Sequence, residues 1–272
     1  MGAPSISLAV AVYNKPECLR FALAACARQS FRDFEIIVAD DGSGPEVAQV
    51  IGEARDRYAL PIVHLWHEDR GWRKNTMLNN AIRAARAEYM VFIDGDCLPS
   101  RRFLGDHWAQ REPGRVLLGR RVETSERWSS ALSLERIENG RFEHLGWKEL
   151  RDGLAGRSLR VEDGIRIPFR FLRTILLRNV TGMLGSNFSV GKADLVTING
   201  FDELYDGPGC GEDSDVQFRL SLTEVQGKSM RNLAVEYHIF HPATKASDAC
   251  WERFQSVKAS GEPRCRHGLR EL

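Results

Sequence analysis

The sequence is short of the features that mark several large protein classes. Its six cysteines are scattered over 272 residues with no C-x-x-C pair, which argues against a disulfide framework or a cysteine-based zinc site. No run approaches the roughly 18 consecutive apolar residues of a membrane span. Neither sign of charge dominates, because 38 Lys and Arg residues oppose 37 Asp and Glu residues, so the net charge does not predict a nucleic-acid partner.

The N-terminal sequence MGAPSISLAVAVYN has no basic stretch before its apolar run and no cleavage-site pattern after it. It therefore predicts a first β-strand and not a signal peptide. Because the scattered cysteines fit free thiols in a reducing compartment, we expect a cytoplasmic protein.

Strand-like apolar segments alternate with segments of helical composition through the first half of the chain. The predicted strands of this half lie at 6–12, 34–39, 62–66 and 89–93. The predicted helices lie at 16–27, 45–58 and 75–86. Such alternation with short loops predicts an α/β fold with a mostly parallel central sheet flanked by helices. In the second half we expect strands at 115–123, 185–191 and 233–240 and a helix at 212–222.

Polar residues follow each of the first four predicted strands. They are Tyr13-Asn14, Asp40-Asp41, His67 to Arg70 and Asp94-Gly95-Asp96. Because ligands of such sheets collect beyond the carboxyl ends of the strands, we expect all four sets to face one crevice. No G-x-G-x-x-G follows the first strand, which argues against a nicotinamide enzyme.

A pair of acids one residue apart ends the strand in YMVFIDGDCLPS. Asp94 and Asp96 repel each other unless a positive group lies between them. His238 and His241 stand at the end of a later predicted strand, and Mn²⁺ accepts imidazole together with carboxylate more readily than Mg²⁺ does. From these residues alone two interpretations stay open: a divalent-cation site, or a solvated turn with incidental histidines.

Seven segments, in order, resemble the inverting glycosyltransferases of family 2, which have the GT-A fold. The first four are SLAVAVYNKPECL, QSFRDFEIIVADDGS, GWRKNTMLNNAI and YMVFIDGDCLPS. The last three, GSNFSVGKADLVTINGFDE, GCGEDSDVQFRL and EYHIFHP, also resemble the C-terminal segment of β-1,4-galactosyltransferases and polypeptide GalNAc-transferases. The resemblance implies a Rossmann-like nucleotide-diphospho-sugar transferase fold. It implies a nucleotide-sugar-binding half at 1–110, an acceptor-binding and catalytic half at 111–242, and a C-terminal tail at 243–272.

The resemblance also assigns residues to the nucleotide. Ala11 and Tyr13 match positions that hold the base, Tyr13 by stacking, and Asp41 matches the contact to the edge of the uracil ring. Asp94 matches the ribose contact. Lys74, with Arg73 as the alternative, falls where the family places a basic residue near the nucleotide or diphosphate.

The remaining assignments concern the cation, the sugar and the reaction. Asp96 matches the metal ligand, with His241 or His238 as the histidine ligand of Mn²⁺ or Mg²⁺. Gly185, Ser186 and Asn187 match the stretch beside the transferred sugar, Glu212 an acceptor-binding acid and Asp213 the catalytic base. The implied reaction is a metal-dependent, inverting transfer from a UDP-sugar to a carbohydrate or glycolipid acceptor, as in bacterial polysaccharide or glycolipid synthesis. Taken alone, the two acids at 212 and 213 are equally well explained as favourable charges at a helix N-terminus.

One departure from the family pattern affects the acceptor. The galactosyltransferase-like segment usually reads W-G-G-E-D, whereas this chain has G-C-G-E-D at 209–213, so the aromatic residue that would stack on a sugar is missing. Two other functions remain open: a nucleotidyltransferase, although AVYNKPECL lacks the glycine-rich basic loop of that class, and a nucleotide- or sugar-binding module without turnover.

Seven arginines lie between Arg151 and Arg178, a stretch that ends in FRFLRTILLRNV. In this segment Phe169, Leu172, Ile175 and Leu176 would share a helical face. Either the stretch is a solvated surface or lid over the acceptor, or it is a basic amphipathic helix that contacts the inner face of a membrane.

Overall fold

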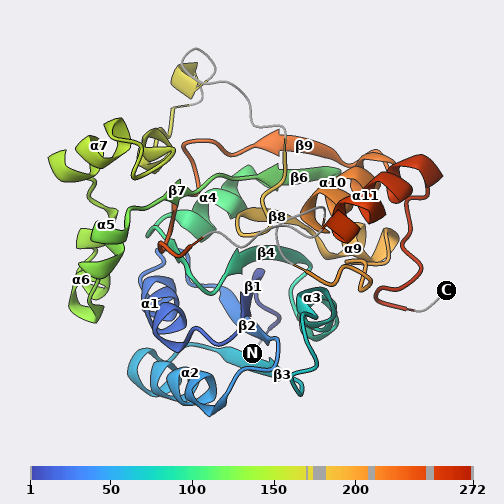
Figure 1. The fold of residues 1–272 in the computed structure, drawn as a ribbon, viewed down its shortest axis with the longest axis horizontal. Helices are drawn as coiled ribbons and strands as arrows, with labels where there is room; N and C mark the ends of the chain where they lie inside the picture. The colour runs from blue at the N-terminus through green and yellow to red at the C-terminus, as the bar shows by residue number, and fades with distance from the viewer. Residues whose placement is uncertain (1, 170, 174–181, 208–211, 243–247, 271–272) are drawn as a thin grey trace.

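The computed structural model describes residues 2–169, 171–173, 182–207, 212–242 and 248–270 (Figure 1). A seven-stranded sheet in the order β3-β2-β1-β4-β8-β6-β9 forms its centre. The strands are β1 (Ile6–Val12), β2 (Phe34–Asp40), β3 (Ile62–Trp66), β4 (Tyr89–Asp94), β6 (Arg115–Leu118), β8 (Phe188–Gly191) and β9 (Gln226–Ser229). Only β8 runs antiparallel to its neighbours, β4 and β6, so the predicted mostly parallel sheet is confirmed.

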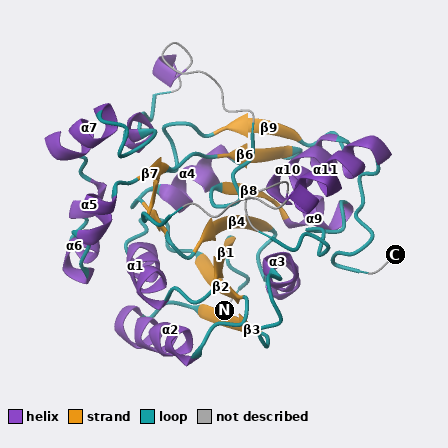
Figure 2. Cartoon of the chain, in the orientation of Figure 1, coloured by secondary structure: helices purple, strands orange, loops and turns teal. Residues whose placement is uncertain are grey.

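Helices cover both faces of this sheet (Figure 2). On one face α1 (Pro16–Ala27) and α2 (Pro45–Tyr58) pack on a core that includes Leu8 and Val10 of β1. On the other face α3 (Lys74–Ala84), α9 (Lys192–Thr197) and α10 (Glu212–Ser221) pack on a core that includes Ala9 and Ala11. Because successive residues of β1 point to opposite cores, the strand is apolar almost throughout, as is typical of a strand buried on both faces.

A second, three-stranded sheet lies beside the first. It has the order β5-β10-β7 and consists of β5 (Cys97–Pro99), β10 (Glu236–His238) and β7 (Val122–Glu123). In its register His238 lies opposite Cys97 on one side and Glu123 on the other. The small sheet therefore brings three distant parts of the chain to the end of β4.

Other helices of the described residues lie around the two sheets (Figure 1). They are α4 (Phe103–Gln110), α5 (Glu126–Ser130), α6 (Leu134–Glu138), α7 (Trp147–Leu154), α11 (Asp248–Ser260) and the short 3-10 helices η1 (Arg141–Glu143) and η2 (Val161–Gly164). Among the described residues, no helix combines the length and the apolar character that a bilayer crossing requires.

The structure corrects the predicted elements of the second half. The strand predicted at 115–123 is two strands, β6 and β7, because the chain changes sheets between them. A side chain at Gly119 would come within 1.9 Å of the amide oxygen of Asn187, so the chain passes close to Asn187 at this change of sheet. The strands predicted at 185–191 and 233–240 shorten to 188–191 and 236–238.

The arginine-rich stretch is described only in part. Its described residues hold the end of α7, the short helix η2 and a helical turn at 171–173, so the helical face predicted for Phe169, Leu172, Ile175 and Leu176 stays a prediction. Residues 170 and 174–178, including Ile175 and Leu176, lie outside the described residues.

Candidate active site

A tight turn brings the two acids of IDGD beside the first strand. The N–H of Gly95 donates to the carbonyl oxygen of Ala11 at 2.7 Å, and a side chain at Gly95 would meet that oxygen and the Cβ of Val12 at 3.1 Å. Glycine at 95 therefore permits Asp94 and Asp96 to lie next to the end of β1.

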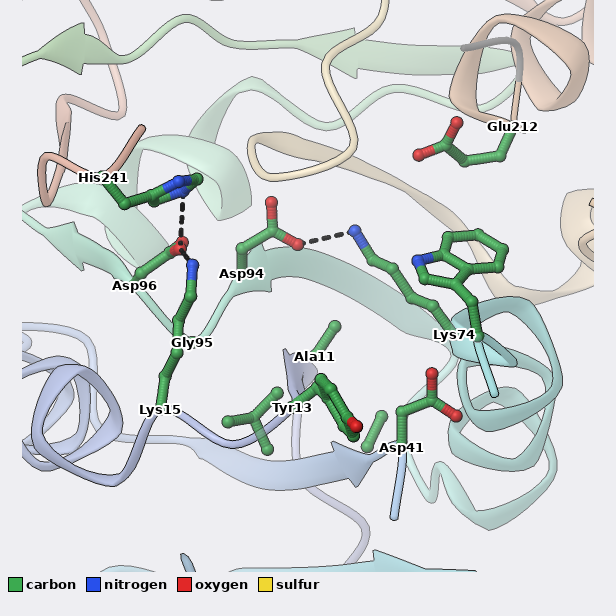
Figure 3. A pocket seen from close by; sticks show the side chains of 13 residues that line it. Ala11, Tyr13, Lys15, Asp41, Lys74, Asp94, Gly95, Asp96, Glu212 and His241 are labelled. Atoms are coloured by element: carbon green, nitrogen blue, oxygen red, sulfur yellow. Dashed lines mark hydrogen bonds and ion pairs between the residues drawn. The ribbon is translucent and has the colours of Figure 1, made fainter. Parts of the chain in front are cut away.

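A pocket of about 270 Å³ lies at this edge of the sheet (Figure 3). Its lining residues are Ala11, Val12, Tyr13, Lys15, Ala39, Asp41, Trp72, Lys74, Asp94, Gly95, Asp96, Glu212 and His241. The ends of β1, β2 and β4 thus face one cavity, as expected beyond the carboxyl ends of parallel strands. The fourth predicted set, 67–70 after β3, does not line this pocket.

At the β2 side of the pocket, the carboxylate of Asp41 is held in place by two donors. His67 Nε2 lies 2.8 Å from one carboxylate oxygen, and the backbone N–H of Arg73 donates to the other at 2.8 Å. The ring of Tyr13 is about half exposed, and its hydroxyl donates to Asp69 at 2.9 Å. An acceptor and an aromatic face therefore lie together at this end of the pocket.

In the centre of the pocket, Asp94 lies between two cationic side chains. Lys74 Nζ is 2.7 Å from one carboxylate oxygen, and Arg121 Nη1 is 3.7 Å from the other. Burial lowers the pKa of Lys74, but attraction by Asp94 and Glu212 outweighs it and raises the pKa above its ordinary value, so the lysine stays protonated. Lys74 lines the pocket, whereas the guanidinium of Arg73 donates to the carbonyl oxygen of Glu68. The geometry favours Lys74 over Arg73 as the basic residue of the site.

At the other end of the pocket, Asp96 meets three nitrogen-bearing side chains. Lys15 Nζ lies 2.7 Å and His241 Nε2 lies 3.3 Å from one carboxylate oxygen, and His238 Nε2 lies 3.6 Å from the other. Burial raises the pKa of Asp96, but the two histidines and the Lys15 ammonium outweigh burial and hold it well below its usual range. The carboxylate is therefore ionised.

Both imidazoles have their second nitrogen occupied. His238 Nδ1 is 2.6 Å from Glu123, and His241 Nδ1 is 2.9 Å from the carbonyl oxygen of Pro242. Metal-binding histidines are commonly oriented in this way, with one nitrogen held by a carboxylate or carbonyl and the other directed at the ion. Both histidines predicted from the sequence thus remain candidate ligands.

The donor atoms at this end suit a hard divalent cation. A ligand atom from each of Asp96, Cys97 and His238 lies within 4.8 Å of the other two. Burial raises the pKa of the Cys97 thiol well above its ordinary value, so the thiol stays protonated and is a poor ligand. Asp96 with His238 or His241 would supply only two or three protein ligands, and Mn²⁺ or Mg²⁺ bound in such a set commonly takes its other ligands from phosphate and water.

The acid pair at the start of α10 divides between two environments. Glu212 lines the pocket on the side of Lys74 (Figure 3), and burial raises its pKa, with a smaller opposing effect of Lys74. Asp213 is not among the lining residues. Its two carboxylate oxygens accept the backbone N–H groups of Gly185 at 2.9 Å and Ser214 at 2.7 Å.

Two of the residues predicted to lie beside the sugar are buried behind the pocket wall. Ser186 and Asn187 are fully buried and do not line the pocket. The Ser186 hydroxyl accepts from Arg121 at 3.0 Å. The side-chain amide of Asn187 donates to the carbonyl oxygens of Arg120 and Ala234, and its oxygen lies 3.2 Å from His107 Nε2. The structure therefore does not bring these two side chains into the described pocket.

Sequence reasoning missed four residues of the site: Lys15, Trp72, Arg121 and Glu123. Lys15, three residues after β1, and Trp72, two residues before α3, stand inside the quoted segments SLAVAVYNKPECL and GWRKNTMLNNAI, so the resemblance of these segments was an available signal. Arg121 and Glu123 reach the site only because the chain changes sheets before β7, and no sequence pattern marks that change.

The sequence model of the family described as Glycosyl transferase family 2 matches residues 7–172. Validoxylamine A glucosyltransferase of Streptomyces hygroscopicus subsp. jinggangensis is 28% identical over 222 residues, which cover 80% of this chain and 51% of that protein. Chondroitin synthase of Escherichia coli is 26% identical over 254 residues, 86% of this chain and 34% of that protein. The chain thus spans about half or less of the length of these relatives.

Solved structures share the fold at low sequence identity. Staphylococcus aureus TarS 1–349 in complex with UDP aligns with a TM-score of 0.61 at 17% identity, over 94% of this chain and 65% of that one. The mannosyltransferase PcManGT of Pyrobaculum calidifontis, in complex with GDP-Man and Mn²⁺, aligns with a TM-score of 0.59 at 13% identity, over 95% and 70%. The expected GT-A architecture is confirmed. The resemblance of the later segments to galactosyltransferases and GalNAc-transferases stays a prediction, since the family match ends at residue 172.

Proposed function

The chain belongs to glycosyl transferase family 2, and we propose that it transfers a sugar from a UDP-sugar to an acceptor hydroxyl with inversion at the anomeric carbon. One observation carries the proposal: a single pocket is lined at one end by Tyr13 and Asp41, in the middle by Lys74 and Asp94, and at the far end by Asp96. A nucleoside diphosphate offers a ring, a ribose and a pyrophosphate in that order. The proposal includes a division of the chain into a nucleotide-binding half at 1–110, an acceptor-binding half at 111–242 and a C-terminal tail at 243–272.

The sugar donor would bind through residues whose positions are already fixed. Tyr13 would stack on the uracil, and Asp41, held by His67 and Arg73, would accept from the N–H of the ring edge. Asp94 would accept from a ribose hydroxyl. Lys74, protonated beside Asp94, would offer its ammonium to the nucleotide phosphates.

A divalent cation fits at Asp96 with His238, His241 or both as ligands. When bound, such an ion neutralises negative charge that develops on a departing diphosphate. The protein's own contribution is to orient the ligands: Glu123 fixes the ring of His238, and the carbonyl oxygen of Pro242 fixes that of His241. Mn²⁺ is our first choice because the site mixes carboxylate with imidazole.

The reaction needs one base and no nucleophile from the protein. We assign Asp213 as the base that takes the proton from the acceptor hydroxyl as this oxygen attacks the anomeric carbon and UDP leaves from the opposite face. Glu212, at the pocket wall, would orient the acceptor by hydrogen bonding. A single displacement inverts the anomeric configuration, in contrast to the two-step route of retaining enzymes.

The test is UDP release from a panel of UDP-sugars, with Mn²⁺ and with candidate acceptors. We expect one sugar donor to give slow release alone and faster release with acceptor, together with a β-linked product from an α-linked sugar donor. Binding of UDP without release under any condition would instead indicate a module without turnover. Release of pyrophosphate from a nucleoside triphosphate would indicate a nucleotidyltransferase.

The proposed acceptor is a polysaccharide or glycolipid, and we propose that the protein contacts a membrane surface. On α7, Trp147, Leu150 and Leu154 share a face and are exposed, Trp147 by 75% and Leu154 by 87%. Arg151 is exposed on the same helix, and an apolar face with arginines suits the surface of an anionic bilayer. This exposed face overlaps the start of the stretch 151–178 and supports the proposed peripheral membrane contact of that stretch.

Vesicle flotation tests this contact. We expect binding to phosphatidylglycerol vesicles but not to phosphatidylcholine vesicles, and at least a fivefold loss in the double variant Trp147→Ser, Leu154→Ser. Trp251→Ser is the matched control, since Trp251 is also exposed but lies on α11. Equal binding of the double variant and the wild type, or self-association in place of lipid binding, would contradict the contact.

A further inference from the structure

Lys15 occupies the side of Asp96 that a divalent cation needs. Its ammonium is 2.7 Å from the same carboxylate oxygen that lies 3.3 Å from His241 Nε2 (Figure 3). No role for this lysine follows from the sugar-donor contacts described above. Its side chain lines the pocket and is 40% exposed, so it is accessible to a ligand in the cavity.

The backbone around Lys15 is held in place while its side chain has space to move. The N–H of Asn14 donates to the Ser43 hydroxyl at 2.9 Å, and the side-chain oxygen of Asn14 accepts from the N–H of Gly44 at 3.0 Å. The carbonyl oxygen of Lys15 accepts from Leu19 in the first turn of α1. A change of partner at Lys15 therefore requires only rotation of a flexible four-carbon side chain.

Electrostatics makes the two cations mutually exclusive at Asp96. A divalent ion bound to the carboxylate and an imidazole would lie within a few ångströms of the ammonium, and like charges at that range repel strongly. The ammonium would then need another anion. Lys15 and Lys74 both line the pocket, and a diphosphate bound there would offer its oxygens to both.

We propose that Lys15 is a two-partner residue: it holds Asp96 when the site is empty and binds the diphosphate when metal and nucleotide are present. This inference rests on the proposed UDP-sugar site. It makes metal binding and nucleotide binding depend on each other. The metal alone must displace Lys15, whereas with the nucleotide bound the displaced ammonium gains a new anion. By linkage, each ligand then raises the affinity for the other by the same factor.

The proposal predicts effects of opposite sign for one substitution. In Lys15→Met, Mn²⁺ without nucleotide should bind roughly fivefold to tenfold more tightly, because no ammonium competes for Asp96. UDP at saturating Mn²⁺ should bind roughly fivefold to tenfold more weakly, because one phosphate contact is lost. A residue with a purely structural role would weaken both, so the reversed sign is the diagnostic result.

Manganese binding is measured by electron paramagnetic resonance of free Mn²⁺, and UDP binding by calorimetry. Lys15→Gln is a second variant that also removes the charge, and thermal unfolding verifies that both variants fold. Arg20→Met is the control. Arg20 lies on α1 and pairs with Glu17 and Glu53, so its substitution removes the same charge away from the pocket. We expect both affinities of Arg20→Met to stay within twofold of the wild type.

Unchanged or weaker Mn²⁺ binding in both Lys15 variants, or unchanged UDP binding, would overturn the proposal while leaving the UDP-sugar site intact. If neither the wild type nor the variants bind Mn²⁺ but UDP still binds, the proposal about Lys15 also fails and the nucleotide site stands. In these two binding measurements, failure of the wild type to bind UDP is the outcome that would count against the proposed nucleotide site itself.

Discussion

The roles of Asp213 and Glu212 can be separated by replacing each with its amide. In Asp213→Asn we expect kcat to fall by a factor of 10² to 10⁴, which corresponds to about 3 to 5 kcal/mol of lost transition-state stabilisation, because the base is removed. The affinity for UDP should stay within about twofold, since Asp213 does not line the pocket. In Glu212→Gln we expect a higher KM for the acceptor and a loss in kcat of less than about 30-fold.

The fold of the Asp213→Asn variant needs its own measurement. Asp213 accepts the N–H groups of Gly185 and Ser214, and an amide can accept only one of them and would direct its own N–H group at the other. The free energy of unfolding should therefore fall by about 1 to 3 kcal/mol, which a chemical denaturation curve resolves. Glu224→Gln, an exposed acid just beyond α10, is the matched control and should leave kcat and stability unchanged.

The pH dependence adds a second readout. Burial raises the pKa of Glu212, so if ionised Glu212 is needed, activity should fall with decreasing pH already above the ordinary glutamate value of 4.5. In Glu212→Gln that acid limb should move to lower pH. If Asp213→Asn keeps activity within tenfold while Glu212→Gln loses 10²-fold or more, the base is Glu212 and the assignment of Asp213 is wrong.

Three further predictions follow from the geometry. Chelation with EDTA should abolish transfer and Mn²⁺ restore it, while Asp96→Asn should not respond to Mn²⁺; full activity in EDTA would contradict the metal proposal. Burial lowers the pKa of the fully buried His107 to about 4, below the unfolded value of 6.5, so the unfolded state takes up its proton first as the pH falls. Because of His107, the free energy of unfolding should fall by about 2 kcal/mol between pH 7 and pH 5. Urea unfolding at the two pH values should show this loss in the wild type and not in His107→Gln. Arg219→Met should lower the free energy of unfolding by about 3 to 5 kcal/mol, because it leaves the buried carboxylate of Asp215 without its ion pair; a loss below 1 kcal/mol would show that the pair contributes little.

The first half of the fold could be predicted from the sequence because its signals are local. Each strand from β1 to β4 is a short apolar run that ends at polar residues, and each intervening helix has its own apolar spacing. The boundaries shifted by at most two residues, for example from 75–86 to 74–84 in α3. The convergence of Asp41, Asp94 and Asp96 on one pocket followed from parallel topology alone.

The second half could not be predicted in the same way because its order is set by long-range contacts. The sequence predicts a single strand where the structure has β6 and β7. The two strands separate near Gly119, where the backbone lies too close to the Asn187 side chain for any other residue. The same separation carries Arg121 to Asp94 and Glu123 to His238. A local pattern has no information about such a change of sheet.

The site lies where the two sheets meet, and this explains why charges of both signs are dense there. The large sheet contributes Asp94 at the end of β4, and the small sheet contributes Glu123 and His238, with Asp96 at the turn between them. So many acids in a partly buried cluster would be unstable without compensation. Lys15, Lys74, Arg121 and the two histidines supply that compensation in this structure. The effect of removing a lysine should therefore depend on its partner. Removal of Lys15 should raise the affinity of Asp96 for a cation. Removal of Lys74 should leave Asp94 to repel the nucleotide. In Lys74→Met, UDP titration at saturating Mn²⁺ should show a loss of UDP affinity. A separate Mn²⁺ titration of the same variant should not show the gain in Mn²⁺ affinity expected for Lys15→Met. An equal gain in Mn²⁺ affinity in both variants would show that the two lysines act only through net charge.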